Sequence, residues 1–430
     1  MLFSDIAVLL PDGSVMPHGF VRTEGETITW VGSEPPPAQK EEVYHGSRKL
    51  LMPGFVNTHC HVPMTLLRGY GEGLPLQEWL NRRIFPFEAQ LTPEDVYWGA
   101  MLGIAEMLQG GIVSFTDMYF HCNSIAKAVD ESGICGNLCF GFTCTEDLPL
   151  SKQPDFLQTS DLYREWNQAG HGRIRVDIGI HAEYSSRPKA VQGIGEFAKA
   201  RQARIHLHLS ETKREQKECL ARHGKTPAQY FADLGVLDSP VTAAHCVWLT
   251  DEDMELLGRY PVTVSHNPTS NLKLGSGVAP VVQMLKKGLR VTLGTDGAAS
   301  NNRYDMFSEM RLALLLQNGL SGNPALLSPA QALQMATVQG AKSQGRKETG
   351  SIQTGKLADF IVVDFDSPHM APCHDPLAQL VYAAQPSDVL LTMCRGKILY
   401  RQGQWLTIDL ERVKAECRKT AERIARLCGA

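Results

Sequence analysis

The stretch LMPGFVNTHCH, residues 51–61, decides how the rest of this sequence is interpreted. It leaves an apolar run, turns at a Pro-Gly pair and ends with His59 and His61 one residue apart. Side chains two residues apart on an extended strand point to the same side, so both imidazoles can bind one metal ion while Cys60 points elsewhere. Two histidines on one strand face are also common as polar residues facing solvent. Any further ligands must come from downstream.

Size and composition narrow the class of protein. The chain has 430 residues, 43% of them hydrophobic and 20% charged, which suits one large barrel with a smaller partner domain. A net charge of −4 gives no basic field, so we expect no nucleic-acid partner. The 11 scattered cysteines indicate reduced thiols. Residues 1–13 lack the basic region of a signal peptide and no later run is as long as a membrane span, so we expect a cytoplasmic protein with no membrane contact.

Downstream of residue 53, short apolar strands alternate with helical lengths of chain such as residues 93–109, a pattern typical of βα units and a parallel sheet. Eight candidate strands occur, at residues 54–59, 112–117, 136–142, 174–181, 204–209, 240–245, 261–266 and 289–296. Eight units over this length predict an α/β fold, a (β/α)₈ barrel.

Both ends of the chain have a different character, with short strands separated by turns at residues 11–13, Gly25, 395–396 and 402–403. We expect the two ends to combine into one small β-sandwich beside the barrel. The predicted domains are residues 1–52 for the first part of the sandwich, 53–350 for the barrel, and 351–430 for the second part plus an amphipathic helix at 409–427.

In such barrels the active site lies at the carboxyl ends of the strands. Seven of the 14 histidines fall at or near these ends, together with Asp117, Thr143 and Asp296. His208 closes the fifth strand and Asp296 the eighth, and with the first pair they form a ligand set typical of hydrolytic zinc sites. A carboxylate there can also take a proton from water. His206 shares a face with His208, but the position nearer the rim favours His208 as the ligand.

Several other polar residues near the rim can be interpreted in more than one way. Glu211 is either a functional acid or a first-turn helix residue favoured by the helix dipole. His181 and His245 could each be a ligand, a hydrogen-bond donor or a core histidine. His266 ends a candidate strand, but His266-Asn267-Pro268 could simply be a turn, and a functional role there is less favoured. No lysine ends the fourth strand, which argues against a second metal bridged by a carbamylated lysine.

Nine segments in order resemble the amidohydrolase superfamily and, within it, the 5′-methylthioadenosine/S-adenosylhomocysteine deaminase family. They are MPGFVNTHCHVPMTLLRG, LQEWL, FPFEAQLTPED, HAEYSS, HLHLSET, AAHCVWLTDED, SHNPTSNLKLGSG, LGTDGAASNN and GKLADFIVVD. The resemblance implies one divalent metal ion, usually Zn²⁺, held by His59, His61, His208 and Asp296. It also implies that Glu211 reaches a ring nitrogen and that His245 polarises the attacked centre or the bound water.

The same resemblance implies that Glu88 grips the ribose hydroxyls, that His181 contacts the nucleoside and that Trp79 is a wall for the 5′ substituent. The implied reaction is hydrolytic deamination of a 6-aminopurine nucleoside, with Asp296 accepting a proton from water and Glu211 protonating the ring. The substrates would be 5′-methylthioadenosine, S-adenosylhomocysteine, adenosine or 5′-deoxyadenosine. We also expect a homo-oligomer.

One departure from the family pattern bears on the substrate, and two alternative functions remain open. The loop after the third strand has Lys152 but no arginine to meet a homocysteine carboxylate, so uncharged 5′ groups are favoured unless Arg164 or Arg173 serves. The same metal set would also suit an aminohydrolase or chlorohydrolase of guanine, an oxidised purine or an s-triazine. A non-catalytic scaffold is the alternative from another class, and it would be expected to have lost ligands.

Overall fold

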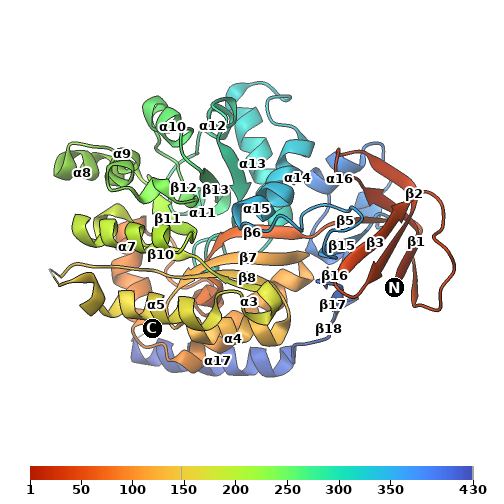
Figure 1. The fold of residues 1–430 in the computed structure, drawn as a ribbon, viewed down its shortest axis with the longest axis horizontal. Coiled ribbons are helices and arrows are strands. Elements are labelled where there is room, and N and C mark those ends of the chain that lie inside the picture. The colour runs from red at the N-terminus through yellow and green to blue at the C-terminus, as the bar shows by residue number, and fades with distance from the viewer. Residues whose placement is uncertain (147, 429–430) are drawn as a thin grey trace.

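The barrel occupies the middle of the chain in the computed structural model, which describes residues 1–146 and 148–428 (Figure 1). All eight predicted strands are present, and the fourth is divided into two. The barrel strands are β6 (Phe55–Cys60), β7 (Ile112–Tyr119), β8 (Cys135–Phe140), β9 (Ile174–Val176), β10 (Ile178–Ile180), β11 (Ile205–Leu209), β12 (Val241–His245), β13 (Val262–His266) and β14 (Arg290–Leu293). Neighbouring strands pair in parallel, in the orders β6-β7-β8-β9 and β10-β11-β12-β13-β14.

Two backbone hydrogen bonds join these two parallel sheets into a ring. The Asp296 N–H donates to His59 O at 3.0 Å, which links the end of β14 to β6, and the Asp177 N–H donates to Leu138 O at 3.0 Å beside the break in the fourth strand. Side chains fill the ring, since the residues of β6, β7 and β8 are all buried. The strand ends therefore meet at one rim, as a closed barrel requires.

Helices surround the barrel, and their boundaries follow the sequence signals (Figure 1). They are α3 (Pro93–Gln109), α4 (Cys122–Ser132), α5 (Pro154–Trp166), α7 (Pro188–Ala200), α8 (Lys213–His223), α9 (Pro227–Asp233), α10 (Asp251–Leu257), α11 (Pro268–Lys273), α12 (Val281–Lys286), α13 (Met306–Ser321), α14 (Pro329–Ala336) and α15 (Val338–Ser343). At α3 the Thr92 hydroxyl accepts from the Asp95 N–H at 3.3 Å while the Asp95 carboxylate accepts from the Thr92 N–H at 2.8 Å. This reciprocal cap, followed by Pro93, fixes where α3 begins.

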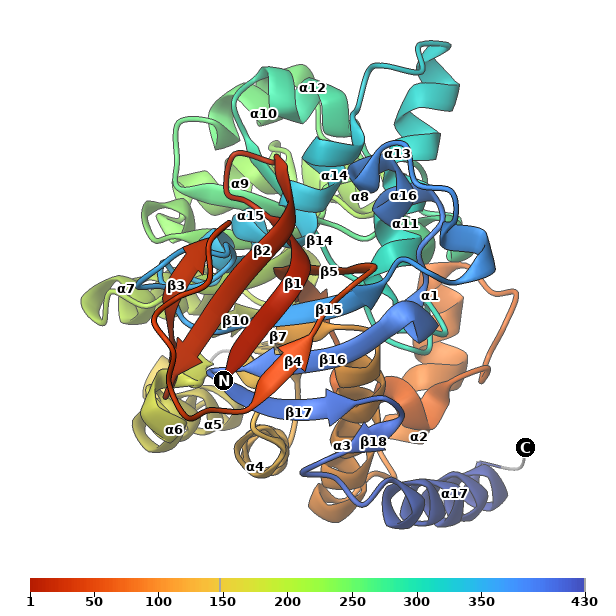
Figure 2. The same cartoon turned by 90° about the vertical axis from the view of Figure 1, so that its right-hand side faces the viewer.

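The two ends of the chain pair in one nine-stranded sheet, so the predicted union of the termini is confirmed (Figure 2). Its members are β1 (Leu2–Leu9), β2 (Val15–Glu24), β3 (Thr27–Gly32), β4 (Val43–His45), β5 (Lys49–Pro53), β15 (Phe360–Asp364), β16 (Val389–Cys394), β17 (Lys397–Arg401) and β18 (Gln404–Trp405). Thr27 in β3 also forms a bridge to Leu357, just before β15, so the sheet curls back on itself. A separate apolar core that includes Phe3 and Phe360 fills the space inside.

Two hairpin turns from opposite ends of the chain meet in this sheet. Gly396 has a φ of 74°, and a Cβ there would lie 1.9 Å from the carbonyl oxygen of Gly25. Arg395, beside it, donates to the Glu26 carboxylate at 3.0 Å through Nε. The last predicted helix, α17 (Leu410–Leu427), packs instead on α3 of the barrel. No helix within residues 1–146 and 148–428 is both long and apolar enough to cross a membrane.

Candidate active site

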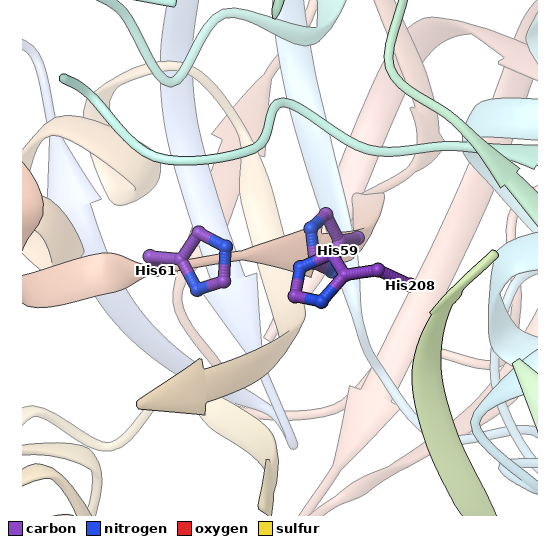
Figure 3. A group of neighbouring side chains, drawn as sticks. All are labelled: His59, His61 and His208. Carbon is purple, nitrogen blue, oxygen red and sulfur yellow. The ribbon is translucent and has the colours of Figure 1, made fainter. Parts of the chain in front are cut away.

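Three histidines and one aspartate converge at the carboxyl rim of the barrel. His59 lies in β6 and His61 directly follows it, while His208 comes from β11 and Asp296 follows β14. His59, His61 and His208 can each place one nitrogen within 4.8 Å of the other two. Asp296 Oδ1 lies 3.4 Å from His59 Nε2 and 3.2 Å from His61 Nε2. Figure 3 shows the three rings gathered in one region.

The Nδ1 atoms of these histidines are engaged, which leaves Nε2 facing the centre of the group. His61 Nδ1 lies 2.5 Å from Met118 O and His208 Nδ1 lies 2.7 Å from His181 O. A carbonyl oxygen only accepts, so both Nδ1 atoms carry a hydrogen, and Nε2 is the nitrogen that presents a lone pair when each ring is neutral. His59 Nε2 is buried with no hydrogen-bond partner. This arrangement is the one that histidine ligands of metal ions have.

Burial and the neighbouring carboxylate set the charges in the group. Burial lowers the pKa of His59 to about 4. At His61 burial also acts downward, but the hydrogen bond and charge of Asp296 outweigh it and raise the pKa to about 9. Burial opposes ionisation of Asp296, yet the two imidazoles hold the pKa of this carboxyl well below its usual range. Burial lowers the pKa of His208 well below its usual value, so this ring is neutral.

Asp296 is held in one orientation from several sides. Its Oδ2 accepts from the Ser270 hydroxyl at 2.5 Å and from the Ser300 hydroxyl at 3.0 Å, and its Oδ1 accepts from the Gly297 N–H at 2.8 Å. The φ angles of Asp296 and His245 are 60° and 72°. Such left-handed backbone costs a non-glycine residue about 1–2 kcal/mol and clusters at functional sites. The surrounding hydrogen bonds therefore hold the Asp296 carboxylate in place although the backbone of this residue is strained.

A cavity of about 620 Å³ opens above this group. It is lined by His61, Met64, Leu76, Gln77, Trp79, Leu80, Asn81, Ile84, Phe85, Glu88, Met118, Tyr119, Phe120, Gly141, Thr143, Thr145, His181, Tyr184, Ser185, His208, Glu211, His245, Leu274 and Asp296. Asp296 is 5% exposed at the floor, whereas Phe85 is 46% exposed at the mouth. The volume suits a drug-sized or nucleoside-sized ligand.

Glu211 and His245 stand beside one another in this cavity. His245 Nε2 lies 3.9 Å from Glu211 Oε2, and the Ser276 hydroxyl donates to Glu211 Oε1 at 3.1 Å. Burial raises the pKa of Glu211. His245 Nδ1 lies 2.8 Å from Asn271 Oδ1, so an amide oxygen fixes its hydrogen on that nitrogen. The pair therefore combines an acid that burial biases toward its protonated form with an oriented imidazole.

The loop that carries Glu211 is fixed by a second acid. Glu215, in the first turn of α8, accepts from the Ser210 N–H at 2.8 Å and from the Glu211 N–H at 2.7 Å. Ser210 has a φ of 50°. Burial raises the pKa of Glu215 to about 7. The backbone between His208 and Glu211 is thus tied to the helix that follows.

The wall of the cavity contains polar atoms without protein partners. Glu88 Oε1, the Tyr119 hydroxyl and His181 Nδ1 are buried with no hydrogen-bond partner. Burial raises the pKa of Glu88 to about 7 and lowers the pKa of His181 to about 4. Trp79, only 5% exposed, closes another side with its ring. Unpaired buried polar groups are costly, so these atoms are well placed to receive polar groups of a ligand.

The structure brings nearly all the predicted site residues into one cavity. His59 lies behind the lining, and His206 lies further in, with its Nε2 2.8 Å from His59 Nδ1. His266 is the last residue of β13, which confirms the strand predicted at residues 261–266. The alternative of a simple turn is wrong, because Asn267 is buried and the helix α11 begins directly at Pro268.

Several contributing residues had no signal in the sequence analysis. They are Tyr119, Asn271, Ser276, Glu215, Ser270 and Ser300. Single serine, asparagine or tyrosine residues are too common for spacing alone to mark them. Of the cations considered from the sequence, Arg164 pairs with Asp161 at 2.8 Å and Arg173 pairs with Asp130 at 2.8 Å, and neither lines the cavity.

Comparisons with known proteins agree with this geometry. The model of the amidohydrolase family matches residues 50–399. A 5-methylthioadenosine/S-adenosylhomocysteine deaminase from Caldanaerobacter subterraneus subsp. tengcongensis is 43% identical over 407 residues, 94% of each chain. The corresponding protein from Thermoanaerobacter pseudethanolicus is 41% identical over 427 residues, 99% of each chain.

Solved structures show the same fold. An adenosine deaminase from Xanthomonas campestris with bound zinc has a TM-score of 0.91 and 30% identity, covering 99% of this chain and 98% of that one. A zinc complex of an atrazine chlorohydrolase from Arthrobacter aurescens TC1 has a TM-score of 0.90 at 22% identity, covering 98% and 99%. The chain therefore belongs to the amidohydrolase family and, within it, to the 5-methylthioadenosine/S-adenosylhomocysteine deaminase family, which confirms the resemblance and the (β/α)₈ barrel fold.

Proposed function

We propose that this chain is a metal-dependent aminohydrolase that deaminates 6-aminopurine nucleosides to inosine-type products and ammonia. The observation that carries the proposal is the convergence of His59, His61, His208 and Asp296 below a cavity in which Glu211 and His245 stand side by side. The names of the 41–43% identical relatives point to 5-methylthioadenosine and S-adenosylhomocysteine as substrates. Adenosine, named for the structural neighbour, and 5′-deoxyadenosine belong to the same class.

The donor set fits one divalent ion, for which we propose Zn²⁺. His61 and His208 present their Nε2 atoms, His59 Nε2 has no other partner, and Asp296 is an oriented carboxylate. When bound, such an ion lowers the pKa of water from 15.7 to about 7 and so supplies a nucleophile at neutral pH. His206 would hold the His59 ring from behind through the 2.8 Å contact at Nδ1.

Asp296 is proposed as the base that takes a proton from the attacking water. Its lowered pKa keeps it ionised, and the Ser270 and Ser300 hydroxyls hold Oδ2, so that Oδ1 stays directed at the two imidazoles. The same carboxyl group would pass a proton to the departing amine. A fixed base within reach of the proton is what general-base catalysis requires.

Glu211 is proposed as the acid that protonates the purine ring, so that negative charge does not build up there as C6 is attacked. Its raised pKa favours the protonated form needed for this step. His245, with its hydrogen on Nδ1, has a lone pair at Nε2 that can accept a hydrogen bond from the water. It becomes a donor to the reacting centre only after it is protonated.

The substrate contacts follow from the cavity wall. An ionised Glu88 can accept hydrogen bonds from both ribose hydroxyls, and the adjacent Tyr119 hydroxyl is free to join them. His181 can contact the nucleoside, and the Trp79 ring can cover the 5′ substituent. A cytoplasmic location, the absence of a nucleic-acid partner and a homo-oligomeric state stay predictions from the sequence.

Ammonia release by the zinc-loaded protein tests the proposal. Adenosine, 5′-deoxyadenosine and 5-methylthioadenosine would be compared with guanine, an oxidised purine and an s-triazine. We expect turnover of the nucleosides only. Activity confined to free bases or triazines would contradict the proposal, and it would favour a hydrolase of another heterocycle on the same fold.

A further inference from the structure

The mouth of the cavity limits which 5′ groups a nucleoside substrate can carry. With the purine at the floor beside Glu211 and Asp296, the 5′ end of a nucleoside must point toward the exposed rim. Six apolar side chains surround that path, from Leu76, Leu80, Ile84, Phe85, Phe120 and Leu274. The exposed polar residues of the rim are Asn81, Thr143 and Thr145, and all three are uncharged.

The described lining contains carboxyl groups but no lysine or arginine. Glu88, Glu211 and Asp296 are the three acids, and the residues that would hold a cation lie at the floor, at the end opposite the mouth. A ligand carboxylate near the mouth would therefore lose water without gaining a cationic partner.

Arginines adjacent to the mouth have partners of their own. Arg82 pairs with Glu78 at 3.4 Å, and the Arg83 guanidinium lies 6.0 Å from the centre of the Tyr70 ring. Arg187 is the cation most closely tied to the rim, because its Nε donates to Thr145 O at 2.7 Å. Its side chain nevertheless lies outside the lining.

We propose that this site selects adenine nucleosides with uncharged 5′ substituents and discriminates against those whose 5′ group ends in a carboxylate. The inference rests on the proposed deaminase function and narrows its substrate class. A methylthio, methyl or hydroxyl group meets the apolar ring around the mouth without losing a charge interaction with water. A homocysteine group has to leave its carboxylate unpaired.

The test uses a matched pair of substrates. Two 5′-alkylthioadenosines of equal chain length, one ending in a carboxylate and one in a primary carboxamide, differ in charge and hardly in size. The zinc-loaded enzyme should give a kcat/KM at least fivefold higher for the amide, and a ratio below fivefold would overturn the inference. 5-Methylthioadenosine serves as the reference: loss of its turnover would reject the deaminase function itself, whereas turnover with a low ratio rejects only the selectivity.

Two variants locate the cause of the discrimination. Thr145→Arg places a cation at the mouth and should lower the amide-to-carboxylate ratio at least threefold, whereas the uncharged control Thr145→Gln should not. Equal ratios in these two variants would overturn the electrostatic explanation. Arg187→Ala should leave the ratio within twofold of the parent value, and a larger increase would identify Arg187 as a carboxylate partner and overturn the proposal.

Discussion

Replacing Glu211 by glutamine tests the central chemical step most directly. Glutamine has nearly the same shape, and its amide oxygen can still accept the hydrogen bond that Ser276 donates at 3.1 Å. The buried side chain should therefore stay in place, at 6% exposure, while the transferable proton is lost. Loss of a positioned proton donor costs 10²–10⁴-fold, so we expect kcat to fall by that factor, equivalent to about 3–5 kcal/mol on the barrier.

The pH dependence of kcat/KM gives a second test of the role of Glu211 as proton donor. Because burial raises the pKa of Glu211, its protonated form persists to higher pH than that of a free glutamate, and kcat/KM in the parent enzyme should decline as pH rises through that pKa. This decline should be absent from the residual activity of Glu211→Gln. Steady-state ammonia release across the pH range provides both quantities.

The matched control is Glu218→Gln, on the exposed face of the adjoining helix, where the carboxylate pairs with Arg214 at 2.6 Å and with Arg222 at 3.4 Å. It should keep activity within twofold, because exposed ion pairs contribute little. Metal content, measured by elemental analysis, should equal that of the parent in both variants. If Glu211→Gln kept more than a tenth of the parent kcat with metal bound, the proton-transfer role would be refuted.

Three further predictions concern the metal, the cavity wall and the terminal sheet. Chelation should abolish ammonia release and lower the melting temperature, both restored by Zn²⁺, and a chelated protein with full activity would contradict a metal-dependent site. Burial raises the pKa of Glu88 from 4.5 to about 7, so this carboxyl loses stability relative to the unfolded chain as pH rises from 4.5 through 7. Glu88→Gln should therefore raise the free energy of unfolding by about 3 kcal/mol at pH 8 but not at pH 4, and it should raise KM for adenosine at least tenfold. Unchanged stability at pH 8 would argue against a buried charge. Gly396→Ala should lower the free energy of unfolding in denaturant by at least about 2 kcal/mol, because the new Cβ would lie 1.9 Å from a carbonyl oxygen. The control Gly403→Ala, at a φ of 82° with no atom within 4 Å, should cost about 1 kcal/mol. Equal losses would contradict the close contact of the turns.

Strand positions and the candidate ligand set could be predicted from the sequence because both follow local rules. Alternation along the extended stretch predicted His59 and His61 on one side, and their ring centres do lie 4.9 Å apart. Residues at strand ends had to meet at the rim once a barrel was inferred. The turn alternative at His266 arose because an Asn-Pro pair signals a turn equally well at the end of a strand and within a loop.

The sequence by itself determined the barrel, the pairing of the two termini and the candidate metal ligands, since hydrophobic periodicity and strand-end residues are local properties of the chain. Only the tertiary structure decided which nitrogen of each ring faces the centre of the group, because Met118 O comes from β7 and His181 O from the residue after β10. It also placed Ser276 beside Glu211, 65 residues away in the chain, and left the lining of the mouth without a cation among the described residues. Contacts of this kind depend on how distant segments pack, and the spacing of residues along the chain does not reveal them.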